Sequence, residues 1–234
     1  MTGWADSPLA AFDTEATGPE PLEARIVTAT IAVVNTTPAA PPHQWLADPG
    51  VEIPAEATAI HGITTEHARE HGAEIGSVVA QIRATLASVW RMGVPVVGYN
   101  ISYDLTVLDW ELVRYGMDAL DQVGPVIDPL VLDRALDRFR RGKRTLTAAC
   151  AHYKVRLDGA HDSTADAVAA ARVAWRIAQK YPEVAEMTLP ELMTYQEEAH
   201  MAWAEGFSEY LARQGKSEVI DPSWPIRHLA VVSR

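Results

Sequence analysis

The sequence predicts an α/β fold that is built on a mixed β-sheet. Three apolar, β-branched segments come first, at residues 9–12, 25–35 and 43–47, and they favour an antiparallel meander. Helix-like segments follow and alternate with two short strand-like segments, at residues 94–99 and 123–127. This order of elements is typical of a mixed sheet that is flanked by helices.

The helices are predicted from apolar periodicity and from the residues that begin or end a helix. Apolar side chains recur at helical spacing within residues 75–92, before Gly93. A second helix runs from about residue 103 to residue 115, and Pro129 suits the first turn of a third. Further helices are expected at residues 55–62, from residue 64, at residues 145–153 and at residues 163–180. Thr145 is the expected N-cap of the helix at 145–153, and Asp162 or Ser163 that of the helix at 163–180.

We expect the α/β domain to span residues 1–181 and a C-terminal helical extension with its tail to occupy residues 182–234. The extension contains one long expected helix, at about residues 189–213. Its apolar stripe has two interpretations, a surface that packs on the domain or a surface that docks on a partner. The stripe consists of Leu192, Tyr195, Ala199, Ala202, Trp203, Phe207, Tyr210 and Leu211.

Bulk composition limits the class of protein. The chain has 234 residues, 48% of them hydrophobic and 22% charged, which is enough to bury one sizeable core. The single cysteine, Cys150, cannot form an internal disulfide, and this fits a reducing compartment. The N-terminal residues do not resemble a signal peptide, and no apolar stretch approaches the roughly 20 residues that span a bilayer. We therefore expect a cytoplasmic protein with no membrane partner.

The net charge of −11 argues against general electrostatic binding to nucleic acid. It does not exclude a local site for nucleic acid, because a site built from carboxylates is acidic and divalent ions reverse its local sign. One segment, residues 133–144, is basic. Its cations are either a solvated helix end and loop or contacts to phosphate, and they are Arg134, Arg138, Arg140, Arg141, Lys143 and Arg144.

Two carboxylates, Asp13 and Glu15, lie two residues apart at the end of the first expected strand. The two-residue period of a strand puts both side chains on the same face. Two such carboxylates repel each other unless protons or metal ions intervene, and Mg²⁺ prefers oxygen ligands of this kind. The alternative is a strand end with two solvated acids.

Three further residues have chemistry that suits the same site. Asp104 follows a strand-to-helix connection, where α/β sheets place their ligands. His161 precedes the helix expected at residues 163–180, and its ordinary pKa of about 6.5 suits a general base. Asp166 lies in the first turn of that helix. Each also has a structural interpretation, because first-turn aspartates stabilise helices and loop histidines are usually solvated.

Taken together, three segments resemble the exonuclease motifs of the DnaQ-like family, in its DEDDh branch. They are residues 12–18, residues 100–104 and residues 161–166, and their order and spacing match across about residues 9–178. Residues 60–64 also resemble a segment that recurs in the lineage of proofreading subunits that are like the epsilon subunit of DNA polymerase III. The resemblance implies an RNase H-like fold, which agrees with the mixed sheet expected above.

The resemblance also implies a two-metal mechanism with Mg²⁺ or Mn²⁺. Asp13 would bridge the two ions, Glu15 and Asp166 would complete the shell of one ion, and Asp104 would hold the second. His161 would deprotonate the attacking water. The products would be nucleoside 5′-monophosphates released from a 3′ end.

Further positions are implied to lie along the substrate. Ala16 stands where threonine is common in the family and Tyr103 where phenylalanine is common, and neither change removes a ligand. A capping or core role for His61 and a turn role for Asn100 fit the sequence equally well. The substrate-binding set implied is Thr14, Ala16, Thr17, His61, Asn100 and Tyr103.

We therefore expect a metal-dependent 3′–5′ exonuclease of the proofreading or repair type that acts on single-stranded DNA. DNA is favoured because of residues 60–64, and an exoribonuclease similar to oligoribonuclease or RNase T is the alternative. The alternative from another class is a catalytically silent module that binds nucleic acid or a polymerase. Three alternatives stay open: the protein acts alone, it forms a homodimer, or it binds a polymerase.

Overall fold

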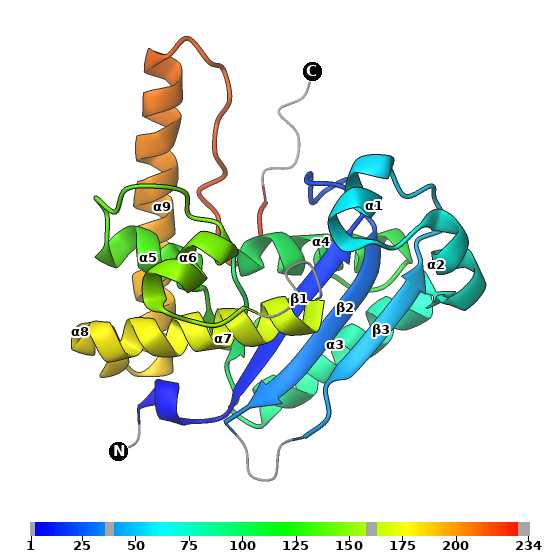
Figure 1. Ribbon diagram of the computed structural model, residues 1–234, viewed down its shortest axis with the longest axis horizontal. Helices are drawn as coiled ribbons and strands as arrows, with labels where there is room; N and C mark the ends of the chain where they lie inside the picture. The colour runs from blue at the N-terminus through cyan, green and yellow to red at the C-terminus, as the bar shows by residue number, and fades with distance from the viewer. Residues whose placement is uncertain (1–2, 36–39, 158–162, 229–234) are drawn as a thin grey trace.

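A six-stranded mixed sheet lies at the centre of the computed structural model, and helices cover both of its faces (Figure 1). The structure describes residues 3–35, 40–157 and 163–228. The strand order is β4-β3-β2-β1-β5-β6, with β1 in the interior of the sheet. This arrangement confirms the mixed α/β fold that the sequence predicts.

The strands follow the predicted pattern of a meander with parallel additions. Strands β1 (Leu9–Ala16), β2 (Ile26–Val34) and β3 (His43–Asp48) pair antiparallel in sequence order. On the other side of β1, the short strands β5 (Val96–Val97) and β6 (Val126–Ile127) run parallel to it. A sixth strand, β4 (Ala73–Glu74), pairs parallel to β3 and is not among the expected strands.

Strand β1 is longer than expected and β5 is shorter. Pairing to β2 continues past Asp13, because Glu15 still lies opposite Thr28 before the register shifts at Ala16. Both strand-end acids therefore lie inside a hydrogen-bonded strand, which constrains their directions. The pairing of β5 to β1 is confined to Val96 and Val97.

The helices begin and end close to the predicted residues. Helix α4 starts at Ile101, two residues before the predicted start, because Asn100 adopts the left-handed conformation with φ of 63° and turns the chain. Thr145 caps α6 as expected, and Asp162 lies outside the described residues. The helices are η1 (Trp4–Asp6), α1 (Ala55–His61), α2 (Thr65–His71), α3 (Ile75–Arg91), α4 (Ile101–Arg114), α5 (Pro129–Leu136), α6 (Leu146–Tyr153), α7 (Ser163–Lys180), α8 (Pro182–Ala185) and α9 (Leu189–Arg213).

Alternating residues of β1 contribute to two separate cores. Ala10 and Phe12 point toward the face that α3 and α4 cover, and both are fully buried there. Leu9 and Ala11 point toward the opposite face, which α7 covers. Because side chains alternate along a strand, this register decides which polar residues of β1 can meet which helix.

Helix α9 covers the outer edge of the sheet. The buried side chain of Gln196 accepts a hydrogen bond from the backbone N–H of Asp128 at 2.7 Å and donates one to the carbonyl of Val126 at 2.9 Å. Edge strands present unpaired backbone groups, and this glutamine satisfies the carbonyl of Val126 in β6 and the N–H of Asp128 just after it. The division of the chain at residue 181 stays a prediction.

The segment after α9 returns to the main body of the protein, alongside α4 (Figure 1). Trp224 and Ile226 are buried in the same core as α3 and α4. The backbone N–H of Arg227 donates to the hydroxyl of Thr106 at 2.9 Å. The tail therefore brings residues from the far end of the sequence to the start of α4.

The apolar stripe predicted on α9 is only partly a packing surface. Leu192 and Leu211 are buried, whereas Phe207 is 38% exposed and Tyr210 is 49% exposed. The packing interpretation is therefore wrong for the two aromatic residues. Within the described part of the chain, no helix is both long enough and apolar enough to cross a membrane, and the cytoplasmic location stays a prediction.

We predict that Gln196→Leu lowers the free energy of unfolding by about 2–4 kcal/mol, because two buried backbone groups of the edge lose their partner. Leucine has a similar volume, so packing changes little. Urea unfolding of both proteins gives the difference, and Glu197→Leu, at an exposed position on the same helix, is the matched control. Equal losses in the two variants would contradict the role assigned to Gln196.

Candidate active site

Three carboxylates converge above the carboxyl-terminal half of β1. Oxygen atoms of Asp13, Glu15 and Asp166 all lie within 4.8 Å of one another, and each residue is half-buried. Asp13 and Glu15 point to the same face of the sheet as Leu9 and Ala11, the face that α7 covers. Asp166 lies in the first turn of α7. Because alternate side chains of β1 point toward α7, Asp13 and Glu15 meet Asp166 there.

The start of α7 is held against the meander by a network of hydroxyl groups. The hydroxyl of Thr30 on β2 lies 2.8 Å from that of Ser163 and 3.1 Å from that of Thr164. The side-chain amide of Gln44 on β3 donates to the hydroxyl of Thr164 at 2.8 Å. These contacts fix the first turn of α7, and therefore Asp166, relative to β1.

Asp104 lies on the other side of β1 and is not part of the three-carboxylate group. Thr14, which has the opposite strand parity to Asp13, donates both its backbone N–H and its hydroxyl to one oxygen of Asp104, at 2.9 and 2.7 Å. Asp104 is only 4% exposed, and burial raises the pKa of its carboxyl to about 7, although the bonds from Thr14 oppose this shift. The structure therefore shows three of the four expected ligands together.

Asn100 is positioned by a second buried acid, which the sequence analysis did not identify. The carboxylate of Asp128 accepts the backbone N–H of Asn100 at 3.0 Å and that of Leu130 at 2.9 Å. Burial raises the pKa of Asp128 to about 6. Asp128 caps α5 and holds the turn that leads into α4, so its role here is structural.

The donor set fits hard divalent cations. Three carboxylates this close together repel one another unless protons or cations intervene. Mg²⁺ and Mn²⁺ prefer carboxylate oxygen, whereas zinc sites are more often built from histidine and cysteine. The group of Asp13, Glu15 and Asp166 contains oxygen donors alone.

Hydrogen bonds of two further predicted site residues order the segment that follows β1. The hydroxyl of Thr17 accepts the backbone N–H of Arg25 at 2.9 Å, and the hydroxyl of Tyr103 donates to the carbonyl of Gly18. Burial raises the pKa of Tyr103, so its hydroxyl keeps its proton at neutral pH. Ala16, the last residue of β1, is half-buried beside these groups.

His61 lines a cavity of about 390 Å³ that also contacts Glu15 and Ser163. Its Nδ1 accepts the backbone N–H of Ile63 at 3.1 Å, so the proton of the neutral ring lies on Nε2. This Nε2 is buried and has no hydrogen-bond partner among the residues that the structure describes. Burial lowers the pKa of the ring, which favours the neutral form as a hydrogen-bond donor.

The expected general base, His161, lies outside the described residues. Its role as a base therefore stays a prediction. The described residue Ser163 begins α7 and lines the same cavity as Glu15.

The basic segment at residues 133–144 separates into two kinds of cation. Arg140 and Arg144 form ion pairs with the fully buried Asp133, at 2.7 and 2.6 Å. They are structural, which neither interpretation of the segment anticipated. Arg134 instead stacks on a ring of α9, with its guanidinium carbon 3.5 Å from the ring centroid of Trp203.

Arg227 is a cation near the site that the sequence analysis missed. Its Nε donates to the hydroxyl of Ser102 at 3.1 Å, next to Tyr103 and Asp104 in α4. No signal in the sequence marks it, because it lies about 60 residues beyond the last motif. Only the return of the tail to α4 brings it there.

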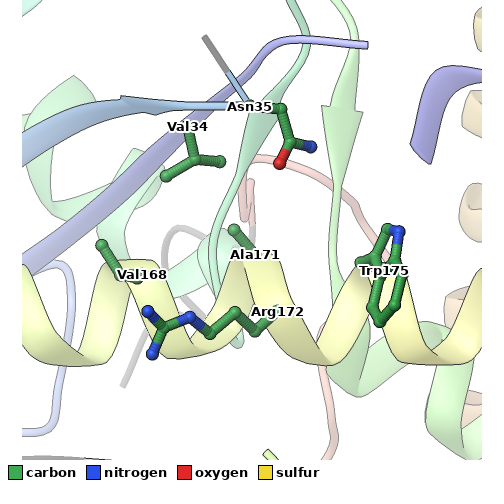
Figure 2. A pocket seen from close by; sticks show the side chains of 6 residues that line it. All are labelled: Val34, Asn35, Val168, Ala171, Arg172 and Trp175. Atoms are coloured by element: carbon green, nitrogen blue, oxygen red, sulfur yellow. The ribbon is translucent and has the colours of Figure 1, made fainter. Parts of the chain in front are cut away.

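A different cavity, of about 340 Å³, lies between the end of β2 and the middle of α7 (Figure 2). Val34 lines it and pairs with Leu9, the first residue of β1, so the cavity is at the opposite end of the strand from Glu15. No carboxylate lines it among the described residues, and the Asn35 amide beside it donates to the backbone carbonyl of Ser7. This cavity is not part of the candidate active site.

An RNase H-like sheet with a carboxylate cluster on its central strand defines a nuclease of the DnaQ-like class. The chain belongs to the RNase T-type exonuclease family, whose family model matches residues 10–174. A match to the PolC-type DNA polymerase III of Lacticaseibacillus paracasei is 33% identical over 96 residues, which is 41% of this chain and 6% of the polymerase.

Solved structures of exonuclease I share the fold. One structure of exonuclease I has a TM-score of 0.67 at 20% sequence identity. The alignment covers 84% of this chain and 45% of the exonuclease I chain. The Escherichia coli complex with a dT13 oligonucleotide has a TM-score of 0.62 at 20% identity, covering 76% of this chain and 42% of its own. The enzyme of Methylocaldum szegediense has a TM-score of 0.60 at 24% identity, covering 75% and 41%. This chain thus spans less than half of these exonuclease I chains.

We predict that Asp13→Asn weakens Mn²⁺ binding at least tenfold, because the removed charge faces both Glu15 and Asp166. Isothermal titration calorimetry with MnCl₂ measures the affinity. Asp118→Asn removes the same charge from an exposed position outside the cluster and serves as the control. Unchanged Mn²⁺ affinity in Asp13→Asn would show that the three carboxylates do not form the ion site.

We predict that Thr14→Val lowers nuclease activity roughly tenfold, since a hydrogen bond to a charged group contributes about 1.5 kcal/mol. Valine has the shape of threonine but cannot donate to Asp104. Thr14→Ser keeps the hydroxyl and should retain most activity. Steady-state rates of all three proteins test the role, and equal losses in the valine and serine variants would count against it.

Proposed function

We propose that this chain is a metal-dependent 3′–5′ exonuclease that releases nucleoside 5′-monophosphates from single-stranded DNA. The observation that carries the proposal is the convergence of Asp13 and Glu15 on β1 with Asp166 on α7. The match of residues 10–174 to the exonuclease family supports it.

Two divalent cations fit the carboxylates. Asp13, Glu15 and Asp166 would hold one, and Asp104 would help to hold the second. Bound ions of this kind activate a water nucleophile and stabilise the charge that develops on the leaving 3′ oxygen. A nearby cation also favours the ionised form of Asp104, which burial disfavours.

The protein's own residues position these groups and move the proton. Thr14 orients Asp104 through two hydrogen bonds, and Tyr103 holds the segment after β1 through Gly18. His61 lines the cavity beside Glu15, where it would contact the substrate. His161 would accept the proton of the attacking water.

DNA is the proposed polymer for two reasons. The relative with the stated sequence match is a DNA polymerase III, and the exonuclease I structures with the same fold include complexes with dT13 and dA16 oligonucleotides. The cavity wall that His61 contributes comes from residues 60–64, the segment that favours a proofreading or repair type. Partnership with a polymerase or with a second copy stays a prediction, as does the cytoplasmic location.

We expect the protein with Mg²⁺ to shorten a 5′-labelled single strand of DNA stepwise from its 3′ end. His161→Ala should lower the rate at least about 100-fold, the usual scale for losing a general base. Asp13→Asn should also lower it strongly, because it removes a ligand of the activating metal ions. His71→Ala, at an exposed position on α2, is the matched control for the histidine. Denaturing gels resolve the product ladder, and chelation with EDTA should stop it.

Other outcomes identify the competing functions. Faster degradation of a matched RNA strand would indicate an exoribonuclease. Strand binding without any degradation would indicate a silent binding module. Full activity in His161→Ala would remove the proposed base, while leaving the carboxylate site to be judged by Asp13→Asn.

A further inference from the structure

Three aromatic rings of α9 form a stacked row on the surface. Trp203 and Phe207 have ring centroids 5.6 Å apart at an interplanar angle of 13°, and Phe207 and Tyr210 have centroids 5.9 Å apart at 14°. Their spacing of four and three residues puts them on one helical face. All three belong to the predicted stripe, and none of them packs against a hydrophobic core of the described residues.

Arg134 faces this row from α5, and its charge is attracted by the buried Asp128 without a direct hydrogen bond. Its guanidinium lies over Trp203 and is half-buried, and it forms no hydrogen bond or ion pair with any residue that the structure describes. A guanidinium has five donors, and leaving them unpaired in a partly buried place is costly. Burial lowers the pKa of Arg134 to about 10, so the group still carries its charge at neutral pH. Its neighbours Arg140 and Arg144 are, in contrast, paired with Asp133.

The α5–α9 groove is the space that these residues enclose. It has a volume of about 480 Å³ and is lined by Arg134, Arg138, Trp203, Phe207 and Tyr210, together with small residues of both helices. The side chain of Arg138 is exposed, and it too forms no ion pair with a described residue. The groove therefore combines two available cations with three aromatic rings.

The groove continues toward the candidate active site. A second cavity, of about 390 Å³, shares Arg134 and Trp203 with it and extends to Asn100 and Arg227. Asn100 precedes the first turn of α4, which carries Tyr103 and Asp104. The lining of this second cavity includes residues of α9, of the tail and of the segment that follows β1. Figure 1 shows the tail returning beside α4.

The chemistry of this path matches a single-stranded polynucleotide better than another ligand. The chain carries a net charge of −11, yet Arg134, Arg138 and Arg227 gather along the path, where Glu20, Glu218 and Asp221 supply opposite charge on the side nearer α4. Guanidinium groups bind phosphate oxygens in a bidentate manner, and aromatic side chains stack on bases of any sequence. An acidic peptide would satisfy the arginines without using the aromatic row.

We propose that the α5–α9 groove binds the single strand upstream of its 3′ end, with Arg134 and Arg138 on phosphates and Phe207 and Tyr210 on bases. This inference rests on the proposed function, because the strand must enter the groove from the three-carboxylate site. It assigns a role to the extension, which lies beyond the residues 10–174 that the family model matches. The groove then acts on affinity for long strands rather than on cleavage.

The test measures how much the affinity for DNA increases with strand length, in the wild-type protein and in variants of the groove. Wild-type protein should bind a 5′-fluorescein oligo(dT) of about 20 nucleotides at least tenfold more tightly than one of about 4, since stacking contributes at each bound base. Fluorescence anisotropy in Ca²⁺ measures binding without relying on turnover. Phe207→Ala/Tyr210→Ala and Arg138→Ala, all at exposed positions, should lose most of this gain, and Arg134→Lys should lose part of it.

Two matched variants control for general effects. Met201→Ala removes an exposed apolar side chain from α9 away from the groove, and Arg91→Ala removes an exposed arginine from α3. Both should keep the wild-type gain with length. If the groove variants showed the same increase in affinity with strand length as the wild-type protein, the inference would be overturned. That result would favour a protein partner on the aromatic row. Failure of active-site variants to affect degradation would overturn the proposed function, independently of this result.

Discussion

The alternation of side chains along β1 is the constraint on which the candidate site depends. This strand is paired on both sides, so its side chains point either toward α7 or toward α4. Asp13 and Glu15 meet Asp166 on the first face, and Thr14 meets Asp104 on the second. A shift of one residue in register would exchange the two sets and bury carboxylates where apolar residues now pack.

Charge neutralisation organises the rest of the molecule around this strand. Buried acids outside the site have partners of their own, since Glu111 pairs with Arg25 and Arg114, and Asp133 pairs with two arginines of the basic segment. In the site, oxygen atoms of Asp13, Glu15 and Asp166 lie within 4.8 Å of one another, and such a set of oxygen donors suits divalent metal ions. Arg134 differs from these arginines, because it stacks on Trp203 at the α5–α9 groove and forms no ion pair with a described residue.

Most of the fold could be predicted because it follows from local periodicity. The meander and α9 were expected close to their observed bounds, because strand and helix periods leave distinct apolar patterns. The early start of α4 was not expected, since it depends on Asp128, which holds Asn100 in a left-handed turn from a distance of 28 residues. The sequence also left open whether the end of α9 is covered, because an apolar stripe does not reveal whether another element packs on it.

The sequence by itself determined the strand parity of Asp13 and Glu15 and the family of the chain, because these depend on residue order and on short-range geometry alone. Only the tertiary structure decided that Asp166 joins them while Asp104 is held by Thr14. It also decided which arginines are structural and which face open space. Pairing between charges depends on neighbours that are distant in the sequence, and composition cannot distinguish an arginine with such a neighbour from one without it.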